Sequence, residues 1–159
     1  MDKLELTVPP IIQVVIFAAI MWVLADVLAP FSMTLAVLLP VAVITALLGV
    51  AFSLLGVYEF HSAGTTVDPR LPEQSASLVT HGVYKVSRNP MYVGFLLILI
   101  GWGIYLGNIV NIMLPVVFVL YMNRFQIVPE ERYMQQKFGH EYSEYKKSSS
   151  SMDIKIKAE

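Results

Sequence analysis

This chain of 159 residues has no cysteine and a small share of charged residues. The absence of cysteine excludes disulfides, thiolate zinc sites and cysteine nucleophiles. Charged residues make up 14% of the sequence and the formal net charge is -1, so no general attraction to nucleic acid is expected. Hydrophobic residues, in contrast, make up 56%, and the mean hydropathy is +0.63. This composition is wrong for a soluble domain and typical of a membrane protein with several spans.

Four apolar segments predict the membrane spans, at about residues 9–28, 33–57, 91–106 and 109–128. The first two reach the roughly 20 residues that cross a bilayer. We expect the first segment to be a retained span and not a signal peptide. Short links at 29–32 and 107–108 pair the segments into hairpins. We therefore predict an all-α integral membrane helical bundle, with about four transmembrane helices in two hairpins.

The basic residues predict the orientation of this bundle. Neither short link carries Lys or Arg, whereas the connection between the hairpins holds Arg70, Lys85 and Arg88. The positive-inside rule then places both termini and the loop at about 58–89 in the cytoplasm. Pro129, the acidic pair after it and Gly139 predict a short amphipathic helix over 129–138. We expect a single membrane-embedded domain over 1–145 and a mobile polar tail over 146–159.

Two polar clusters frame the second hairpin, and polar groups at a membrane boundary are costly unless they serve a purpose. In the first cluster, Asn89 and Pro90 have the pattern of a helix cap and a first helical residue. The N–H groups of such a helix start, together with Arg88, favour a carboxylate or a phosphate. In the second cluster, Glu130 and Glu131 suit ribose hydroxyls or an ammonium group.

Two tyrosines complete this set of polar groups. Tyr84 and Tyr92 can stack on a flat ring or face a cation. Together the groups suit a zwitterionic ligand with an aromatic base, such as S-adenosylmethionine, and no metal site is predicted. Adjacent helical residues point about 100° apart. We therefore expect at least one of Glu130 and Glu131 to face the pocket while the other caps or solvates the short helix.

Five motifs in order along the chain resemble the isoprenylcysteine carboxyl methyltransferase family, which is itself similar to membrane phospholipid N-methyltransferases. The motifs lie at 64–66, 78–84, 88–94, 129–132 and 138–145. The resemblance implies a multi-span fold that binds S-adenosylmethionine at the cytoplasmic side. It also implies that a lipophilic small molecule or lipid enters from the surrounding membrane lipids as the methyl acceptor.

The resemblance also implies roles for individual residues. Arg88 and Glu131 are the predicted catalytic residues, and Tyr142 and Tyr145 match the closing tyrosines of the family. A carboxylate acceptor needs no base, whereas an amine acceptor would lose a proton to Glu131 or His81. The predicted cofactor-binding residues are His81, Gly82, Tyr84, Arg88, Asn89, Pro90, Tyr92, Glu130 and Glu131. The chain is shorter than the eukaryotic enzymes and has Asn89 where many carry His, which bears on a prenylated-protein substrate but not on the cofactor.

Each polar residue also has a structural interpretation. Arg88 can mark the topology, Tyr84 and Tyr92 can be interfacial aromatics, and Glu130 and Glu131 can be first-turn helix charges. Two other functions stay open at this point. One is an NADPH-dependent membrane reductase of the sterol type, whose site would need more basic residues for the extra phosphate. The other is a non-catalytic membrane scaffold with the same fold.

Overall fold

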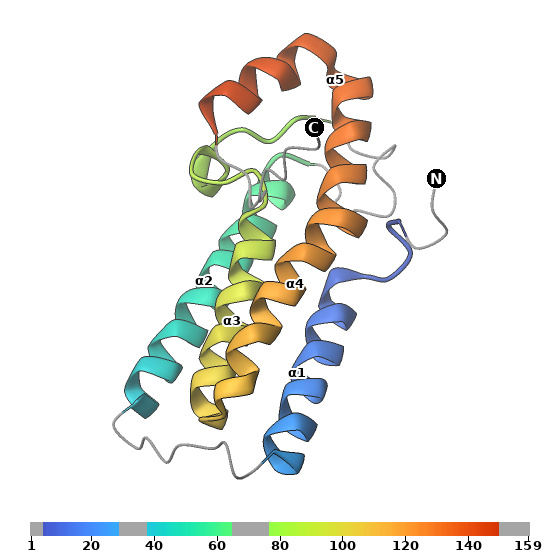
Figure 1. Ribbon diagram of the computed structural model, residues 1–159. Coiled ribbons are helices and arrows are strands. Elements are labelled where there is room, and N and C mark those ends of the chain that lie inside the picture. Colours follow the sequence, from blue (N-terminus) through green and yellow to red (C-terminus); the bar gives the residue numbers. More distant parts are fainter. Residues whose placement is uncertain (1–4, 29–37, 65–76, 150–159) are drawn as a thin grey trace.

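The computed structural model describes residues 5–28, 38–64 and 77–149, and this part of the chain is helical without strands. Four helices lie side by side, and the last one continues beyond the bundle and folds over its end (Figure 1). The elements in order are α1 (Pro10–Val27), α2 (Leu39–Ser62), the 3-10 helix η4 (Gly82–Lys85), α3 (Pro90–Leu106), the 3-10 helix η5 (Ile109–Met113), α4 (Leu114–Met122), the π-helix η6 (Asn123–Ile127) and α5 (Val128–Ser148).

The predicted all-α membrane bundle is confirmed. Three helical stretches are long and apolar enough to cross a membrane, namely Pro10–Val27, Leu39–Ser62 and the continuous stretch Ile109–Ser148. The apolar helix α3 has 17 residues, which corresponds to about 26 Å. The second hairpin link is also confirmed, because Gly107 ends α3 in the left-handed conformation at φ 63°. The first link, at 29–32, lies outside the described residues.

Proline marks the start of each α-helix. Pro10, Pro40, Pro90, Pro115 and Pro129 each occupy the first turn of their helix. The first turn tolerates proline because its N–H groups have no intrahelical partner and the ring already fixes a helical φ. The predicted starts near Pro9, Met91 and Pro129 agree with these positions, whereas α2 and α4 begin later than the predicted 33 and 109.

Small residues bring α2 and α3 into close contact. A Cβ added to Gly49 would lie 2.6 Å from the carbonyl oxygen of Gly94, and one added to Gly101 would lie 2.7 Å from that of Ala42. Such contacts between backbones are how helices associate in lipid, where apolar side chains gain little from leaving the solvent. The glycines at 94 and 101 are therefore packing residues.

Polar side chains attach α1 to the second hairpin. The indole Nε1 of Trp102 donates to the carbonyl of Ala18 at 3.1 Å, and Asn111 Nδ2 donates to that of Met21 at 3.0 Å. Between these bonds the core is apolar, and Met21, Leu99, Phe118, Met122 and Ile127 are fully buried. The bundle is therefore held by packing and by a few side-chain bonds to backbone carbonyls.

The C-terminal helix is longer than the sequence predicted. The predicted start at Pro129 is correct, but α5 continues to Ser148 beyond the predicted end at 138. Gly139, at φ 51° and ψ -115°, is non-helical and separates two helical halves, so the first half ends where the sequence predicted and the half beyond Gly139 was not predicted. Lys146, Lys147 and Ser148, at the start of the predicted tail, are thus helical. Residues 150–159 lie outside the described residues.

Candidate active site

The site lies where η4, the start of α3 and both halves of α5 meet at one end of the bundle (Figure 1). Gly82 begins η4 at φ +58°, and a Cβ there would collide with the side chain of Glu59. The turn buries Tyr84, whose exposure is 4%. The ring of Tyr84 packs edge-on against Phe60, with the ring centroids 5.2 Å apart. The site is therefore built on a turn that fits tightly against the end of α2.

Asn89 precedes α3 as predicted, but its side chain does not cap the helix. Asn89 occupies the N-cap position as the sequence predicted, without a side-chain capping bond. Instead, the hydroxyl of Ser87 accepts a hydrogen bond from the backbone N–H of Asn89 at 3.2 Å. The backbone at Asn89 has φ -129° and ψ 55°. This conformation directs the buried Asn89 side chain to the lining of the site.

Arg88 and Glu131 form the central ion pair. The Nε of Arg88 donates to Oε1 of Glu131 at 2.8 Å, and the two side chains are 9% and 12% exposed. A second cation, Lys146, approaches Oε2 of Glu131 at 2.9 Å. Arg88 Nη1 also donates to the backbone carbonyl of Ser149 at 2.7 Å. Both oxygens of Glu131 are thus neutralised, and the C-terminal half of α5 is tied to the site.

Glu130 has different surroundings. The hydroxyl of Tyr92 donates to its Oε2 at 3.0 Å, and no ion pair with Lys or Arg is found for Glu130 among the described residues. Burial raises the pKa of Glu130 to about 7, against the lowering effect of the Tyr92 bond and with a smaller raising effect from the charge of Glu131. Glu130 therefore exchanges a proton near neutral pH.

Three further tyrosine groups surround this acid. The hydroxyl of Tyr84 is buried and has no hydrogen-bond partner in the described part of the chain. Burial, with the charge of Glu130, raises the pKa of Tyr84 well above the ordinary tyrosine value. Tyr145 donates to the backbone carbonyl of Tyr84 at 2.7 Å, and burial raises its pKa to about 12. Burial likewise raises the pKa of Tyr142. All three hydroxyls stay protonated at physiological pH.

These groups line two small cavities, of about 40 and 20 Å³, that share part of their lining. The residues lining both are Phe60, Tyr84, Arg88, Asn89 and Glu130. Tyr92 lines the smaller cavity, and Glu131, Tyr142 and Tyr145 line the larger. Both Glu130 and Glu131 thus line the larger cavity, whereas the sequence predicted at least one of them there. The two carboxylates differ in their bonding partners.

Three predicted site residues, His81, Gly82 and Pro90, are not among those that line these cavities. His81 is 54% exposed and its Nε2 lies 3.0 Å from Oε2 of Glu59. Gly82 contacts the same carboxylate and serves the turn. Sequence reasoning missed Phe60 and Glu59, which lie near the end of α2, and also Lys146 and Ser149. An acidic residue at the end of an apolar segment, Glu59, was the feature of the sequence that could have pointed to Glu59 and Phe60.

The N-terminal segment braces the helix that carries the acidic pair. Glu5 is 3% exposed at its side chain and pairs with Arg124 at 2.9 Å. Leu6 N–H donates to the carbonyl of Phe125 at 3.0 Å, and Gln126 Nε2 donates to that of Val8 at 2.7 Å. All three contacts fall on or beside η6. A π-turn adds a residue to a helix turn and changes the direction of the side chains after it, so η6 sets how the acidic pair enters the site.

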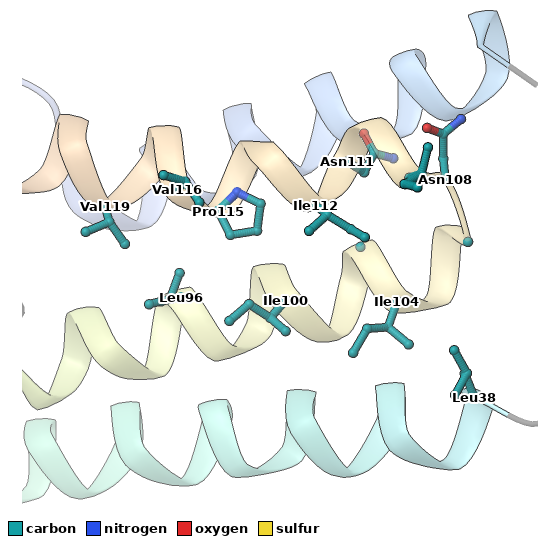
Figure 2. Close-up of a pocket in the computed structure, with 13 residues that line it drawn as sticks. Leu38, Leu96, Ile100, Ile104, Asn108, Asn111, Ile112, Pro115, Val116 and Val119 are labelled. Carbon is teal, nitrogen blue, oxygen red and sulfur yellow. The ribbon is translucent and has the colours of Figure 1, made fainter. Parts of the chain in front are cut away.

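An apolar cavity of about 560 Å³ lies between α3 and α4. Figure 2 shows Leu96, Ile100 and Ile104 of α3 across from Val116 and Val119 of α4. Leu96, at one end of this groove, is one helical turn beyond Tyr92. The groove therefore runs through the bundle toward the polar site and has the volume of a typical ligand pocket.

The fold and the site together define an integral membrane protein with a charged, tyrosine-rich cluster at one end of its second hairpin. Residues 36–141 match the family described as phospholipid methyltransferase. The match covers 106 of the 159 residues, and the chain belongs to this family.

Curated relatives agree with this membership and confirm the predicted resemblance. The chain is 42% identical over 82 residues to protein-S-isoprenylcysteine O-methyltransferase A of Arabidopsis thaliana, covering 50% of this chain and 40% of the plant protein. It is 39% identical over 77 residues to protein-S-isoprenylcysteine O-methyltransferase of Schizosaccharomyces pombe, covering 46% and 31%. An uncharacterized protein of Haemophilus influenzae is 46% identical over 56 residues, covering 35% of this chain and 89% of that protein. The match thus spans less than half of the two named enzymes, and no solved structure matches significantly.

Proposed function

We propose that this protein is a membrane methyltransferase that moves a methyl group from S-adenosylmethionine to a lipophilic acceptor. The observation that carries the proposal is the buried Arg88–Glu131 pair. It joins two of the five family motifs, those at 88–94 and 129–132, across one apolar hairpin, next to tyrosines and an apolar groove. A buried ion pair is a costly way to stabilise a fold, and it is better explained as part of a binding site.

The polar groups of the site fit this cofactor. Arg88 would hold the carboxylate of the methionine moiety by a charge-assisted hydrogen bond. Glu131 would accept from its ammonium group or from the ribose hydroxyls. The buried Tyr84 hydroxyl, which has no partner among the described residues, offers a donor and an acceptor to the same ligand. Asn89 adds an amide beside it.

The size of the cavity implies a movement on binding. A cavity of about 40 Å³ is far smaller than the several hundred Å³ of a typical ligand site. The contacts that close it come from Lys146 and Ser149, which bind Glu131 and Arg88. We infer that the half of α5 beyond Gly139 swings aside to admit the cofactor and then closes over it.

The groove between α3 and α4 supports a lipophilic acceptor that enters from the bilayer. From Leu96 to Gly107 the helix rises about 16 Å, which is enough to hold a long hydrocarbon chain. The polar lining of the groove is limited to two asparagines, Asn108 and Asn111, at the end away from Tyr92. A head group would then lie near Tyr92 and Glu130. By the positive-inside argument this end of the bundle and both termini face the cytoplasm.

The chemistry asks little of the protein beyond binding and orientation. S-adenosylmethionine supplies a methyl group that is already activated by its sulfonium. The side chains of the site hold the reactants in line, and the apolar lining with the folded C-terminal half of α5 excludes water. Positioning of this kind can supply several kcal/mol, on the order of 7–11 in the best cases.

A binding titration of the purified protein in detergent tests the proposal. S-adenosylmethionine should bind and NADPH should not, and labelled methyl groups should pass into a total lipid extract. Arg88→Ala should lose binding, whereas the control Arg132→Ala, at a residue 52% exposed, should retain it. Binding of NADPH alone would favour a reductase, and binding of neither would favour a scaffold.

A further inference from the structure

The π-helix η6 leads directly into the first turn of α5, which carries Glu130 and Glu131. In an α-helix the carbonyl of Phe125 would accept a hydrogen bond from the N–H four residues later. That residue is Pro129, which has no N–H to donate. The backbone N–H of Leu6 donates to the Phe125 carbonyl at 3.0 Å. The segment before α1 thus provides a donor in place of the one that the proline removes.

Leu6 makes this bond from a strained backbone conformation. Its φ is 53°, and within the described part of the chain it is the only residue other than glycine with a positive φ. A bulky side chain rarely tolerates this conformation, which persists only where the surrounding contacts hold it. We call residues 5–8 the N-terminal strap. The bond to η6 accounts for the strain in it.

Side chains hold the strap to the same turn. Gln126, which is fully buried in η6, donates through Nε2 to the carbonyl of Val8 at 2.7 Å, and Gln13 of α1 donates to that carbonyl at 2.8 Å. The side-chain oxygens of both glutamines have no partner among the described residues, so the bond to the strap fixes each carboxamide. Glu5 pairs with Arg124 at 2.9 Å. The strap therefore contacts three successive residues of η6.

The register of η6 decides where the acidic pair points. A π-turn contains one residue more than an α-turn, so relaxation of η6 to an α-helix would rotate every later side chain by about 100°. In the observed register, Glu130 accepts from the Tyr92 hydroxyl at 3.0 Å and Glu131 accepts from Arg88 Nε at 2.8 Å. A rotation of that size would break both contacts.

We propose that Leu6 and Gln126 are positioning residues for the acidic pair, because the N-terminal strap holds η6 in the π register and so fixes Glu130 and Glu131 in the site. Neither Leu6 nor Gln126 lines the two cavities of the site, so both act through η6. For its effect on the cofactor, this inference rests on the proposed methyltransferase function. Its effect on the burial of Glu130 can be measured without any cofactor.

Two substitutions at Leu6 separate the backbone bond from the side chain. Leu6→Pro removes the N–H and excludes a positive φ, whereas Leu6→Gly keeps the N–H and adopts a positive φ readily. In titrations of the full protein in detergent, Leu6→Pro should bind S-adenosylmethionine about tenfold or more weakly than the parent. Leu6→Gly should bind it within about twofold of the parent. Equal affinities of Leu6→Pro and the parent would overturn the inference.

A second pair of variants keeps the strap backbone intact. Gln126→Met and Gln13→Met each remove one hydrogen bond to the carbonyl of Val8, but only the first residue belongs to η6. Both variants should lower the thermal midpoint, and Gln126→Met alone should weaken S-adenosylmethionine binding, by about tenfold. An equal loss of affinity in the two variants would mean that these bonds support the fold in general, and would overturn the positioning role.

The pH dependence of stability provides a readout without cofactor. Burial raises the pKa of Glu130 from 4.5 to about 7, so the stability of the parent should fall as pH rises between these values. Gln126→Met should lose at least about half of this slope, because Glu130 leaves its buried position, whereas Gln13→Met should keep it. The titratable and charged groups that face Glu130 are Tyr84 from η4, Arg88 from the following loop, Tyr92 from α3, and Glu131 and Tyr142 from α5.

Thermal midpoints of the parent and both glutamine variants from pH 4.5 to 8 complete the test. A general structural role would lower the midpoint of Gln126→Met equally at every pH and leave the slope unchanged, and that result would overturn the inference. A slope lost in Gln126→Met and kept in Gln13→Met would support it, even if the parent bound no S-adenosylmethionine. Absence of cofactor binding by the parent would instead refute the proposed function.

Discussion

Arg88 and Glu131 are 43 residues apart in the sequence, yet their side chains meet at 2.8 Å with little exposure to solvent. One residue precedes α3 and the other lies in the first turn of α5. The hairpin of α3 and α4 returns the chain to the same end of the bundle, which brings them together. Because Glu131 also binds Lys146, the pair connects the start of α3 with both halves of α5. Loss of the pair should therefore change the geometry of the site.

The first prediction concerns Arg88. Arg88→Ala removes a charge-assisted hydrogen bond worth roughly 1.5–3 kcal/mol, so affinity for S-adenosylmethionine should fall about ten- to a hundredfold. Arg88→Lys should recover only part of it, because a planar fork becomes a point charge. Calorimetric titration measures both variants against Arg132→Ala. Equal affinity of Arg88→Ala and the parent would remove Arg88 from the binding site.

The second prediction concerns topology. Reporters fused at Ser32 and at Asn108 should appear on the side of the membrane opposite to the termini, since neither link carries a basic residue. A reporter after Lys147 should appear in the cytoplasm. A cytoplasmic reporter at either link would rule out two hairpins with the predicted orientation.

The third prediction concerns the contact between α2 and α3. A Cβ at Gly49 would lie 2.6 Å from the carbonyl oxygen of Gly94. Gly49→Val should therefore push the helices apart and destabilise the protein by about 1–3 kcal/mol. The control Ala51→Val lies on an exposed position of the same helix and should change little. Thermal unfolding in detergent distinguishes the two, and equal midpoints would argue against close packing here.

Much of the fold follows from local signals in the sequence. Apolar length, proline at helix starts and Gly107 as a helix end are all readable along the chain. The acidic pair and Arg88 were also predicted as one site, because a hairpin brings its two ends together. His81 does not line the cavities, because proximity in sequence does not fix the direction of a side chain. Its turn points it to Glu59.

Other features depend on long-range contacts that a sequence does not display. The π-helix η6 is braced by Glu5 and Val8, more than a hundred residues away. Ser149 accepts the hydrogen bond of Arg88 through its backbone carbonyl. Every residue type has this carbonyl, so the side chain at 149 gives no signal in the sequence. The predicted stop at Gly139 is the bend between the two halves of α5, and the half beyond it was not predicted.

The fourth prediction concerns stability and pH. Burial raises the pKa of Glu130 from 4.5 to about 7. Between these values the folded protein binds more protons than the unfolded chain, so stability should fall as pH rises, by up to about 1.4 kcal/mol per pH unit. Glu130→Gln should remove this slope, and the exposed control Glu144→Gln should keep it. Thermal midpoints from pH 4.5 to 8 provide the measurement, and a slope that persists in Glu130→Gln would assign it to another group.

The last prediction concerns the closing half of α5. Gly139 has φ 51° and ψ -115°, a conformation that side chains with a Cβ rarely adopt, at a cost of order 1–3 kcal/mol. Gly139→Ala should therefore weaken the bend that brings Tyr145 and Lys146 over the site. Hydrogen exchange of amides 142–148 should become faster, while exchange in α1 to α4 stays unchanged.

A matched control is Gly64→Ala, because Gly64 also has a positive φ of 62° and a Cβ would meet nothing within 4 Å at either glycine. The control also places an alanine at a positive φ but lies just beyond the end of α2, so amides 142–148 should exchange as in the parent. In the parent, S-adenosylmethionine should slow exchange of the same segment, because the closed half of α5 covers the ligand. If Gly139→Ala left this segment fully protected, the bend would be held by the contacts of Tyr145 and Lys146 alone, and Gly139 would not be the hinge.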